Sequence, residues 1–331
     1  MELYIAGGCG EHGRNSFLFL THSHNDHSGG IEWLIENGFH GCIISTDETR
    51  KQVNIAYENW VILPVTGRMP LRKEIGQTLS ITYGRTGHCI GSIWFLIEWN
   101  YKKVFFSGDY KEDSSVYMCD RVRNIFADCA VIDCAYGNLK IDTVGFGDSL
   151  IKRVENTIHT GGSVYLPVPK YGRGLEIIQI LNKSGDEYPV YADRNIYEQM
   201  ELIEQRGCLW TESMNISLQS LKTWNDEPAV LFISDPQLQK EEDYELAIKV
   251  YQNGGSILLT GHVYSGTGAE KLLKKKYATS MLYPVHMNYH DLCELVKANH
   301  FSNVILNHHA GRINDMEHIA LNVETGKTIE F

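Results

Sequence analysis

Short apolar runs alternate with segments of helical pattern along most of the chain. The run LFLTHSH at residues 18–24 is followed by the helix-like GGIEWLIENGF at 29–39. Two further apolar runs, SIWFLIEW and KVFFSGD, fall within residues 92–109, and GGSVYLPVP at 161–169 precedes RGLEIIQILNK at 173–183. Strands of about four to eight residues that end in Gly or Asp turns and lead into helices predict an α/β protein.

Glycine and proline mark the expected domain boundaries. They are densest in three segments, at residues 137–147, 161–174 and 254–268. Such clusters are typical of turns and connections between compact parts of a chain. We therefore predict that the middle of the chain is an inserted domain and that the two ends form one domain together: residues 1–147, 148–272 and 273–331.

The composition is that of a globular protein, and the charge is acidic. The 331 residues are 43% hydrophobic and 21% charged, and 30 Lys+Arg against 41 Asp+Glu give a formal net charge of −11. Proteins that hold long nucleic acids through counterion release are usually basic. The charge therefore argues against broad, nonspecific binding of a polymer, although it leaves room for a local basic groove and does not include the charge of bound metal ions.

The cysteines and the apolar runs predict a cytoplasmic protein without a membrane segment. The eight cysteines are scattered and form no CxxC pair, which favours reduced thiols over a disulfide framework. No run reaches the roughly 20 apolar residues that a spanning helix needs. The N-terminal MELYIAGGCGEHGR lacks the basic and apolar regions of a secretory signal.

The densest group of metal-binding side chains lies in THSHNDH at residues 21–27. A strand that ends in THSH would send His22 and His24 to the same side, because side chains alternate along a strand. Asp26 and His27 would then lie at the start of the next helix. Imidazole and carboxylate ligands suit zinc, and also manganese or iron. The alternative is a polar turn that happens to be rich in histidine.

Two later residues can complete a metal site. His88 lies in the Gly-flanked turn TGHCIGS, and Asp109 follows the strand-like KVFF. Each alone also fits an ordinary turn residue. Together with THSHNDH they can form a two-metal centre in which Asp109 bridges both ions. One metal would take the histidines and the other the remaining pair: His22, His24 and His88 for the first, Asp26 and His27 for the second.

The order HxHxDH, GHxxGS and SGD resembles the metallo-β-lactamase superfamily of hydrolases. Later segments are similar to its β-CASP nucleases: DCAYG at 133–137, GGSVYLPVPKYGRGLEIIQIL at 161–181, LLTGHVYSGTGAEKLL at 258–273, VHMNYHDLCELV at 285–296 and NVILNHHAG at 303–311. The similarity extends from about residue 7 to residue 311. It implies an αββα sandwich with an inserted smaller α/β β-CASP domain, and metals at the edges of the sheets.

The resemblance also implies roles for individual residues. His308 would join Asp26 and His27 on the second metal, and Asp26 would also accept a proton from the attacking water. His286 would be the general acid, oriented by Asp133. The alternatives are a surface histidine at 286, a turn residue at 133, and His309 as the ligand in place of His308.

Two residues of the middle segment are candidates for binding phosphate. Arg173 lies in the Gly-rich KYGRG before a helix, where its guanidinium can face a phosphate. Thr267, in SGTG, can add backbone donors in the same way. For Arg173, the alternative is a solvated residue in a turn.

One segment departs from the family pattern. Typical members carry a strand that ends in an Asp within a DxG motif between the N-terminal Gly-rich stretch and HxHxDH. Here GEHGRNSF runs almost directly into LFLTHSHNDH, so that Asp has no counterpart, either because the first sheet carries a deletion or because the sequence omits a loop. Because it normally supports a ligand-bearing loop and binds no metal itself, we expect metal binding to persist.

These observations predict a phosphodiesterase with two Zn²⁺, or Mn²⁺ or Fe²⁺ in their place. The favoured hypothesis is a β-CASP ribonuclease that acts on single-stranded RNA in the cytoplasm. The alternatives are a hydrolase of a small phosphodiester, nucleotide or other ester, and a noncatalytic scaffold of the same fold. The sequence leaves open whether the chain forms a homo-oligomer.

Overall fold

The computed structural model describes residues 3–5, 16–74, 77–137, 145–183, 188–211 and 217–308. The chain divides into two compact units, of which unit 2 (Ile141–Val285) is inserted into unit 1 (Met1–Lys140 and His286–Phe331). Both predicted limits of the insertion, 148 and 272, fall inside unit 2. The reason at the second limit is that a strand of unit 2 follows residue 272, beyond the glycine-rich turn that suggested the boundary.

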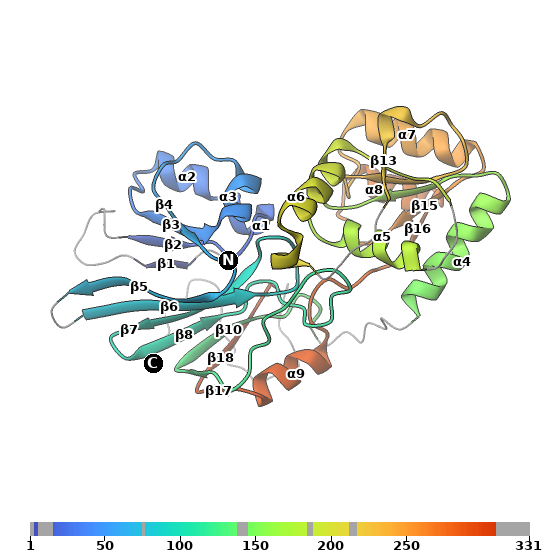
Figure 1. Ribbon diagram of the computed structural model, residues 1–331. Helices are drawn as coiled ribbons and strands as arrows, with labels where there is room; N and C mark the ends of the chain where they lie inside the picture. The colour runs from blue at the N-terminus through green and yellow to red at the C-terminus, as the bar shows by residue number, and fades with distance from the viewer. Residues whose placement is uncertain are drawn as a thin grey trace. The chain divides into compact units, whose positions relative to one another are not determined.

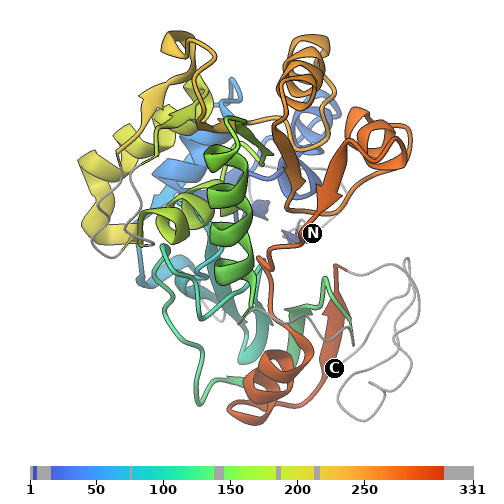
Figure 2. The same cartoon turned by 90° about the vertical axis from the view of Figure 1, so that its right-hand side faces the viewer.

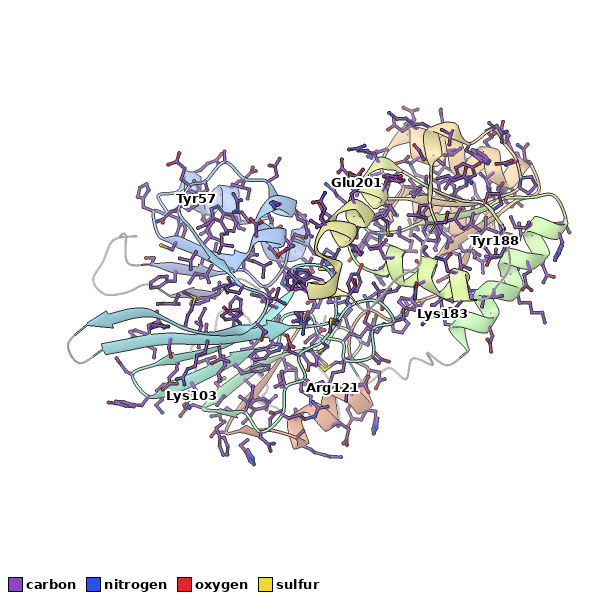
Figure 3. All side chains as sticks on the ribbon, viewed as in Figure 1. Tyr57, Lys103, Arg121, Lys183, Tyr188 and Glu201 are labelled. Carbon is purple, nitrogen blue, oxygen red and sulfur yellow. The ribbon has the colours of Figure 1, made fainter. Side chains whose placement is uncertain are left out.

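The first sheet of unit 1 has the order β1-β2-β3-β4. Its elements are β1 (Leu3–Ile5), β2 (Phe17–Phe19), β3 (Cys42–Thr46) and β4 (Trp60–Leu63), with helices α1 (Asn25–Ser28), α2 (Ile31–Glu36) and α3 (Asp47–Val53). β1 is antiparallel to β2, and the other pairs are parallel. Helices α2 and α3 lie over one face (Figure 1), where Ile31 packs with Leu18 and Ile43. Tyr57, labelled in Figure 3, closes this cluster against Phe39.

The second sheet of unit 1 has the order β18-β10-β8-β7-β6-β5. Its strands are β5 (Gly67–Glu74), β6 (Gln77–Arg85), β7 (Ile93–Trp99), β8 (Lys102–Phe106), β10 (Cys129–Asp133) and β18 (Val304–Asn307), with the short pair β9 (Phe126–Ala127) and β17 (His300–Phe301) beside it. β5 to β8 are antiparallel, whereas β8, β10 and β18 are parallel. Helix α9 (Tyr289–Lys297) covers the outer face, where Leu292 and Leu295 pack with Phe105 and Ile132 (Figures 1 and 2).

The inner faces of the two sheets form the core of unit 1. Phe19 of β2 and Phe95 of β7 meet edge to face, with ring centroids 5.4 Å apart. Ile44 of β3 and Ile81 of β6 are fully buried. Helices on both outer faces and two sheets between them give the αββα sandwich that the resemblance implies, so this prediction is confirmed.

Unit 2 is built on a parallel sheet of order β13-β12-β14-β11-β15-β16. Its elements are α4 (Phe146–His159), β11 (Val164–Pro167), α5 (Arg173–Lys183), β12 (Val190–Ala192), α6 (Arg194–Trp210), β13 (Gln219–Ser220), β14 (Val230–Ile233), α7 (Glu241–Gln252), β15 (Ser256–Leu259), α8 (Gly268–Lys274) and β16 (Ala278–Ser280). The helix predicted over 173–183 is α5. Helices α7 and α8 pack through Val250 and Leu272 on the face that carries Leu231 and Ile257.

Every helix in the part of the chain that the structure describes is too short or too polar to cross a lipid bilayer.

The packing around Phe105 generates a stability prediction. Phe105 is fully buried and stacks on Phe301, with ring centroids 5.4 Å apart. Replacing a buried phenylalanine by alanine costs about 3–5 kcal/mol through lost burial and the cavity that remains. We expect Phe105→Ala to lower the free energy of unfolding of unit 1 by about that amount in urea titrations followed by circular dichroism. Phe126→Ala, at a ring that is 62% exposed, is the control and should change it by less than about 1 kcal/mol.

Candidate metal centre

Three adjacent parallel strands bring distant parts of the sequence to one edge of the second sheet. In the register of the sheet, Phe106 of β8 lies opposite Val131 of β10, and Asp133 of β10 lies opposite Asn307 of β18. Asp109 follows β8, Asp133 ends β10, and His308 follows β18. Because the carboxyl ends of parallel strands meet at the same edge, these three side chains converge.

The loop that carries THSHNDH leaves the first sheet earlier than predicted. β2 ends at Phe19, and residues 20–24 are irregular before α1 begins. After the bond from Leu20 N–H to the Ile44 carbonyl, the Thr21 carbonyl accepts from Ile93 N–H of the second sheet. The predicted strand through THSH is therefore wrong. Bonding to the second sheet draws the chain out of the first, yet His22 and His24 still converge.

The first set of candidate ligands consists of His22, His24, His88 and Asp109. His24 Nδ1 lies 3.2 Å from His22 Nε2 and 3.1 Å from His88 Nε2. Asp109 Oδ2 lies 3.4 Å from His22 Nε2 and 3.3 Å from His88 Nε2. A tetrahedral zinc ion with bonds of about 2.0–2.1 Å holds its ligand atoms about 3.3 Å apart. The donor atoms thus have the spacing that such an ion requires.

The second set consists of Asp26, His27 and His308. Asp26 Oδ2 lies 3.1 Å from His308 Nε2 and 3.7 Å from His27 Nε2. The free oxygen of the first set, Asp109 Oδ1, lies 3.2 Å from His27 Nε2 and 3.3 Å from His308 Nδ1. Asp109 therefore presents one oxygen to each set. The alternative ligand His309 lies outside the described residues.

The environment of His308 is unusual in both backbone and charge. Its φ of 73° is left-handed, which is uncommon for a residue other than glycine. Such strained conformations cluster at functional sites. Hydrogen bonds to Asp133 and Asp26 raise the pKa of His308 to about 11.

The buried imidazoles of the first set are neutral. Burial and, after it, the charge of His27 lower the pKa of His22 to about 3, and burial lowers the pKa of His88 well below its usual value. Burial works against ionisation of Asp109, but the surrounding histidines, His22 first, hold the pKa of its carboxyl well below the usual range. Neutral imidazoles and ionised carboxylates are the forms that bind metal ions, so the residues present fit a metal centre.

His286 and Asp133 form a hydrogen-bonded pair beside these ligands. His286 Nδ1 lies 2.9 Å from Asp133 Oδ2, and Tyr110 N–H donates to the same oxygen. Burial lowers the pKa of His286, but the charges of Asp133 and Asp109 outweigh it and raise this pKa above its ordinary value. The ring of Tyr136 stands edge-on to that of His286. The two carboxylates therefore favour the protonated form of this ring.

The two candidate phosphate ligands lie in unit 2, where both take part in local structure. Arg173 Nε donates to the buried Thr260 Oγ1 at 3.2 Å. The Thr267 hydroxyl caps helix α8, because it accepts from Glu270 N–H and donates to the Tyr264 carbonyl. The site in unit 1 does not depend on these contacts, and phosphate binding by either residue stays a prediction.

Two hydroxyl groups that support the site have no role in the sequence-based interpretation. Ser107 Oγ accepts from Asp133 N–H at 2.8 Å and donates to the Gly108 carbonyl at 2.7 Å. Thr21 Oγ1 lies within hydrogen-bonding distance of two ligand candidates. The sequence could have indicated both residues by their position, because Thr21 and Ser107 each lie directly before a stretch that carries a candidate ligand. The shortened N-terminal segment cannot be compared, because residues 6–15 lie outside the described part of the chain.

Comparisons with known proteins identify a superfamily and several relatives. Residues 16–154 match the model of the metallo-beta-lactamase superfamily. The chain is 23% identical over 282 residues to "Probable RNase MJ4" of Methanocaldococcus jannaschii, a match of 75% of this chain and 61% of that protein. It is 22% identical to "Endoribonuclease ysh-1" of Neurospora crassa, over 78% of this chain and 38% of that protein.

A third relative is named for a different process. The "Transcription termination factor FttA" of Methanosarcina mazei is 28% identical over 55% of this chain and 33% of that protein. The chain thus spans less than two thirds of the length of each of these relatives. Together the matches confirm the resemblance to the superfamily and its β-CASP nucleases that the motifs indicate.

The raised pKa of His308 generates a prediction about metal uptake. At pH 7 this ring carries a proton in the metal-free protein, and the proton must leave before the ring can bind an ion. Apparent metal affinity should therefore rise with pH below about pH 11. Zinc titration calorimetry in buffers of different ionisation enthalpy measures the released protons.

In that experiment His308→Ala should release about one proton fewer than the natural protein. His300→Ala, at an exposed ring on β17, is the matched control and should release as many as the natural protein. Equal proton release by His308→Ala and the natural protein would contradict the assignment.

Proposed function

This chain contains a metallo-β-lactamase superfamily domain over residues 16–154, and we propose that it is a two-metal phosphodiesterase that cleaves single-stranded RNA. The observation that carries the proposal is the division of Asp109 between two groups of ligands, with Oδ2 toward His22 and His88 and Oδ1 toward His27. A carboxylate that faces two ligand groups is typical of a bridge between two ions in phosphodiesterases.

The proposed ligands fall into two sets that share Asp109. The residues are His22, His24 and His88 for one ion, and Asp26, His27 and His308 for the other. Zinc suits this mixture of imidazole and carboxylate, and manganese and iron(II) also accept it. When bound, two such ions neutralise charge on the phosphodiester and lower the pKa of water. Asp26, which is 57% exposed, is the residue proposed to accept a proton from that water.

His286 is proposed as the general acid. Its Nδ1 is held by Asp133, so Nε2 remains to give a proton to the oxygen that leaves. Its raised pKa supports this role, because a general acid must be protonated at the working pH. Asp133 fixes the tautomer and orientation of the ring and so acts as a positioning residue.

The choice of RNA rests on the names of relatives. Two proteins similar to this chain are named RNase and endoribonuclease. The net charge of −11 favours a second candidate, a hydrolase for a small phosphodiester or nucleotide. The noncatalytic scaffold has less support, since the predicted ligands converge into two groups with metal-ligand spacing.

A cleavage assay with end-labelled single-stranded RNA tests the proposal on zinc-loaded protein. Removing a general acid costs about 10²- to 10⁴-fold in rate, so His286→Ala should lose that much activity and keep its metal content. Asp26→Ala should lose activity together with part of its bound metal. His290→Ala, an exposed histidine on the nearby helix α9, is the matched control and should cleave like the natural protein.

If the natural protein binds two ions and leaves RNA intact, the RNA proposal fails. Cleavage of cyclic and linear dinucleotides by the same protein would then support the second candidate.

A further inference from the structure

The side chain of Thr21 contacts one candidate ligand from each set. Its Oγ1 lies 3.1 Å from His22 Nδ1 and 3.4 Å from His27 Nδ1. The residue is 6% exposed, His22 is fully buried and His27 is 5% exposed. One buried hydroxyl thus lies against both halves of the centre.

The opposite nitrogen of each ring faces the shared carboxylate. His22 Nε2 lies 3.4 Å from Asp109 Oδ2, and His27 Nε2 lies 3.2 Å from Asp109 Oδ1. A ring that binds a metal through Nε2 carries its proton on Nδ1, and the partner of Nδ1 sets the tautomer and orientation. A hydroxyl oxygen has two acceptor lone pairs. Thr21 Oγ1 can therefore accept from both rings at once.

Packing fixes the direction of this hydroxyl. A Cβ atom added to Gly108 would lie 3.0 Å from Thr21 Cβ and 3.1 Å from its methyl carbon Cγ2, so the methyl group rests against the Gly108 backbone. The Thr21 carbonyl accepts from Ile93 N–H at 3.0 Å, which holds the main chain. These contacts restrict the rotation of a β-branched side chain, and its hydroxyl lies within hydrogen-bonding distance of the two rings.

The Thr21 hydroxyl can also donate a hydrogen bond of its own. A cavity of about 20 Å³ is lined by Thr21, His27, Asp109 and Asp133, among others. A cavity of this size holds about one water molecule. This water can accept a hydrogen bond from the Thr21 hydroxyl while the hydroxyl oxygen accepts hydrogen bonds from the two imidazoles.

We propose that Thr21 is a positioning residue that fixes the Nδ1–H tautomer of both His22 and His27 and thereby links the two metal sites. This inference rests on the two-metal centre of the proposed function. Without the hydroxyl, both buried Nδ1–H groups lose their acceptor, and an unsatisfied buried donor costs free energy. Both ions should therefore bind more weakly, although Thr21 touches neither ion.

The first test compares metal affinity in isosteric variants. Loss of a residue that hydrogen-bonds to a metal ligand typically costs about 10- to 100-fold in metal affinity. We expect Thr21→Val to lower the affinity for both ions by that factor. Thr21→Ser, which restores the hydroxyl, should recover most of the affinity. Thr157→Val, at a threonine of unit 2 that is also 6% exposed, is the control for a buried Thr→Val change. Metal content after dialysis against graded chelator gives the affinities.

Two results of this test overturn the proposal. One is unchanged affinity for both ions in Thr21→Val. The other is loss at one ion only, because a single shared acceptor must affect both sites.

The second test observes the Nδ1–H groups of His22 and His27 by NMR in zinc-loaded protein labelled with ¹⁵N-histidine, because in metal-free protein Nε2 of each ring faces the Asp109 carboxylate, which can itself hold a proton there. The natural protein should show hydrogen-bonded Nδ1–H protons on both rings, and Thr21→Val should shift both resonances and speed their exchange with solvent. Unchanged resonances in Thr21→Val contradict the proposal. Neither test uses RNA, so a protein that binds two ions but cleaves no RNA refutes the proposed nuclease activity and leaves the proposed role of Thr21 intact. If no metal binds, the proposed function fails, and the role of Thr21, which rests on it, fails with it.

Discussion

The rest of the centre depends on the contacts between the buried carboxylate of Asp109 and the imidazoles around it. It is 3% exposed, and a buried, ionised carboxylate is costly unless it is paired. Imidazoles from several separate loops surround it, and these loops belong to different parts of the sandwich. His22 follows β2 of the first sheet, His88 follows β6 of the second, and His308 follows β18 at the edge of that sheet. Both sheets of the sandwich must therefore be in place before these imidazoles can surround the buried Asp109 carboxylate.

The acidic charge of the chain and an anionic substrate are compatible at this centre. The cluster contains three carboxylates, those of Asp26, Asp109 and Asp133, and two bound divalent ions would more than offset their charge. Exposed charges elsewhere on an acidic surface are screened within about 8 Å at physiological ionic strength. The local electrostatic potential at the centre therefore determines whether a phosphate binds there. The net charge of −11 does not indicate that potential.

The sequence was sufficient for the features that depend on local pattern. Period and turn residues indicated the α/β class and helix α5, and the order of short motifs indicated which side chains converge. It was insufficient where a non-local bond decides. β2 ends at Phe19 because the Thr21 carbonyl accepts a hydrogen bond from Ile93 N–H of the other sheet. The local sequence THSH does not predict this hydrogen bond. Likewise, the extra strand β16 beyond residue 272 depends on its pairing with β15 of unit 2.

The point of insertion of unit 2 has a consequence for folding. The chain leaves the second sheet after Asp133 and returns to unit 1 at His286, and the hydrogen bond between these residues spans 153 positions. Closing an unstructured loop of that length costs roughly 4 kcal/mol or more in chain entropy, which exceeds the contribution of one hydrogen bond, about 1.5–3 kcal/mol when a charge takes part. If unit 2 folds first, its compact structure shortens the effective loop. The order of folding events thus bears on whether His286 and Asp133 meet.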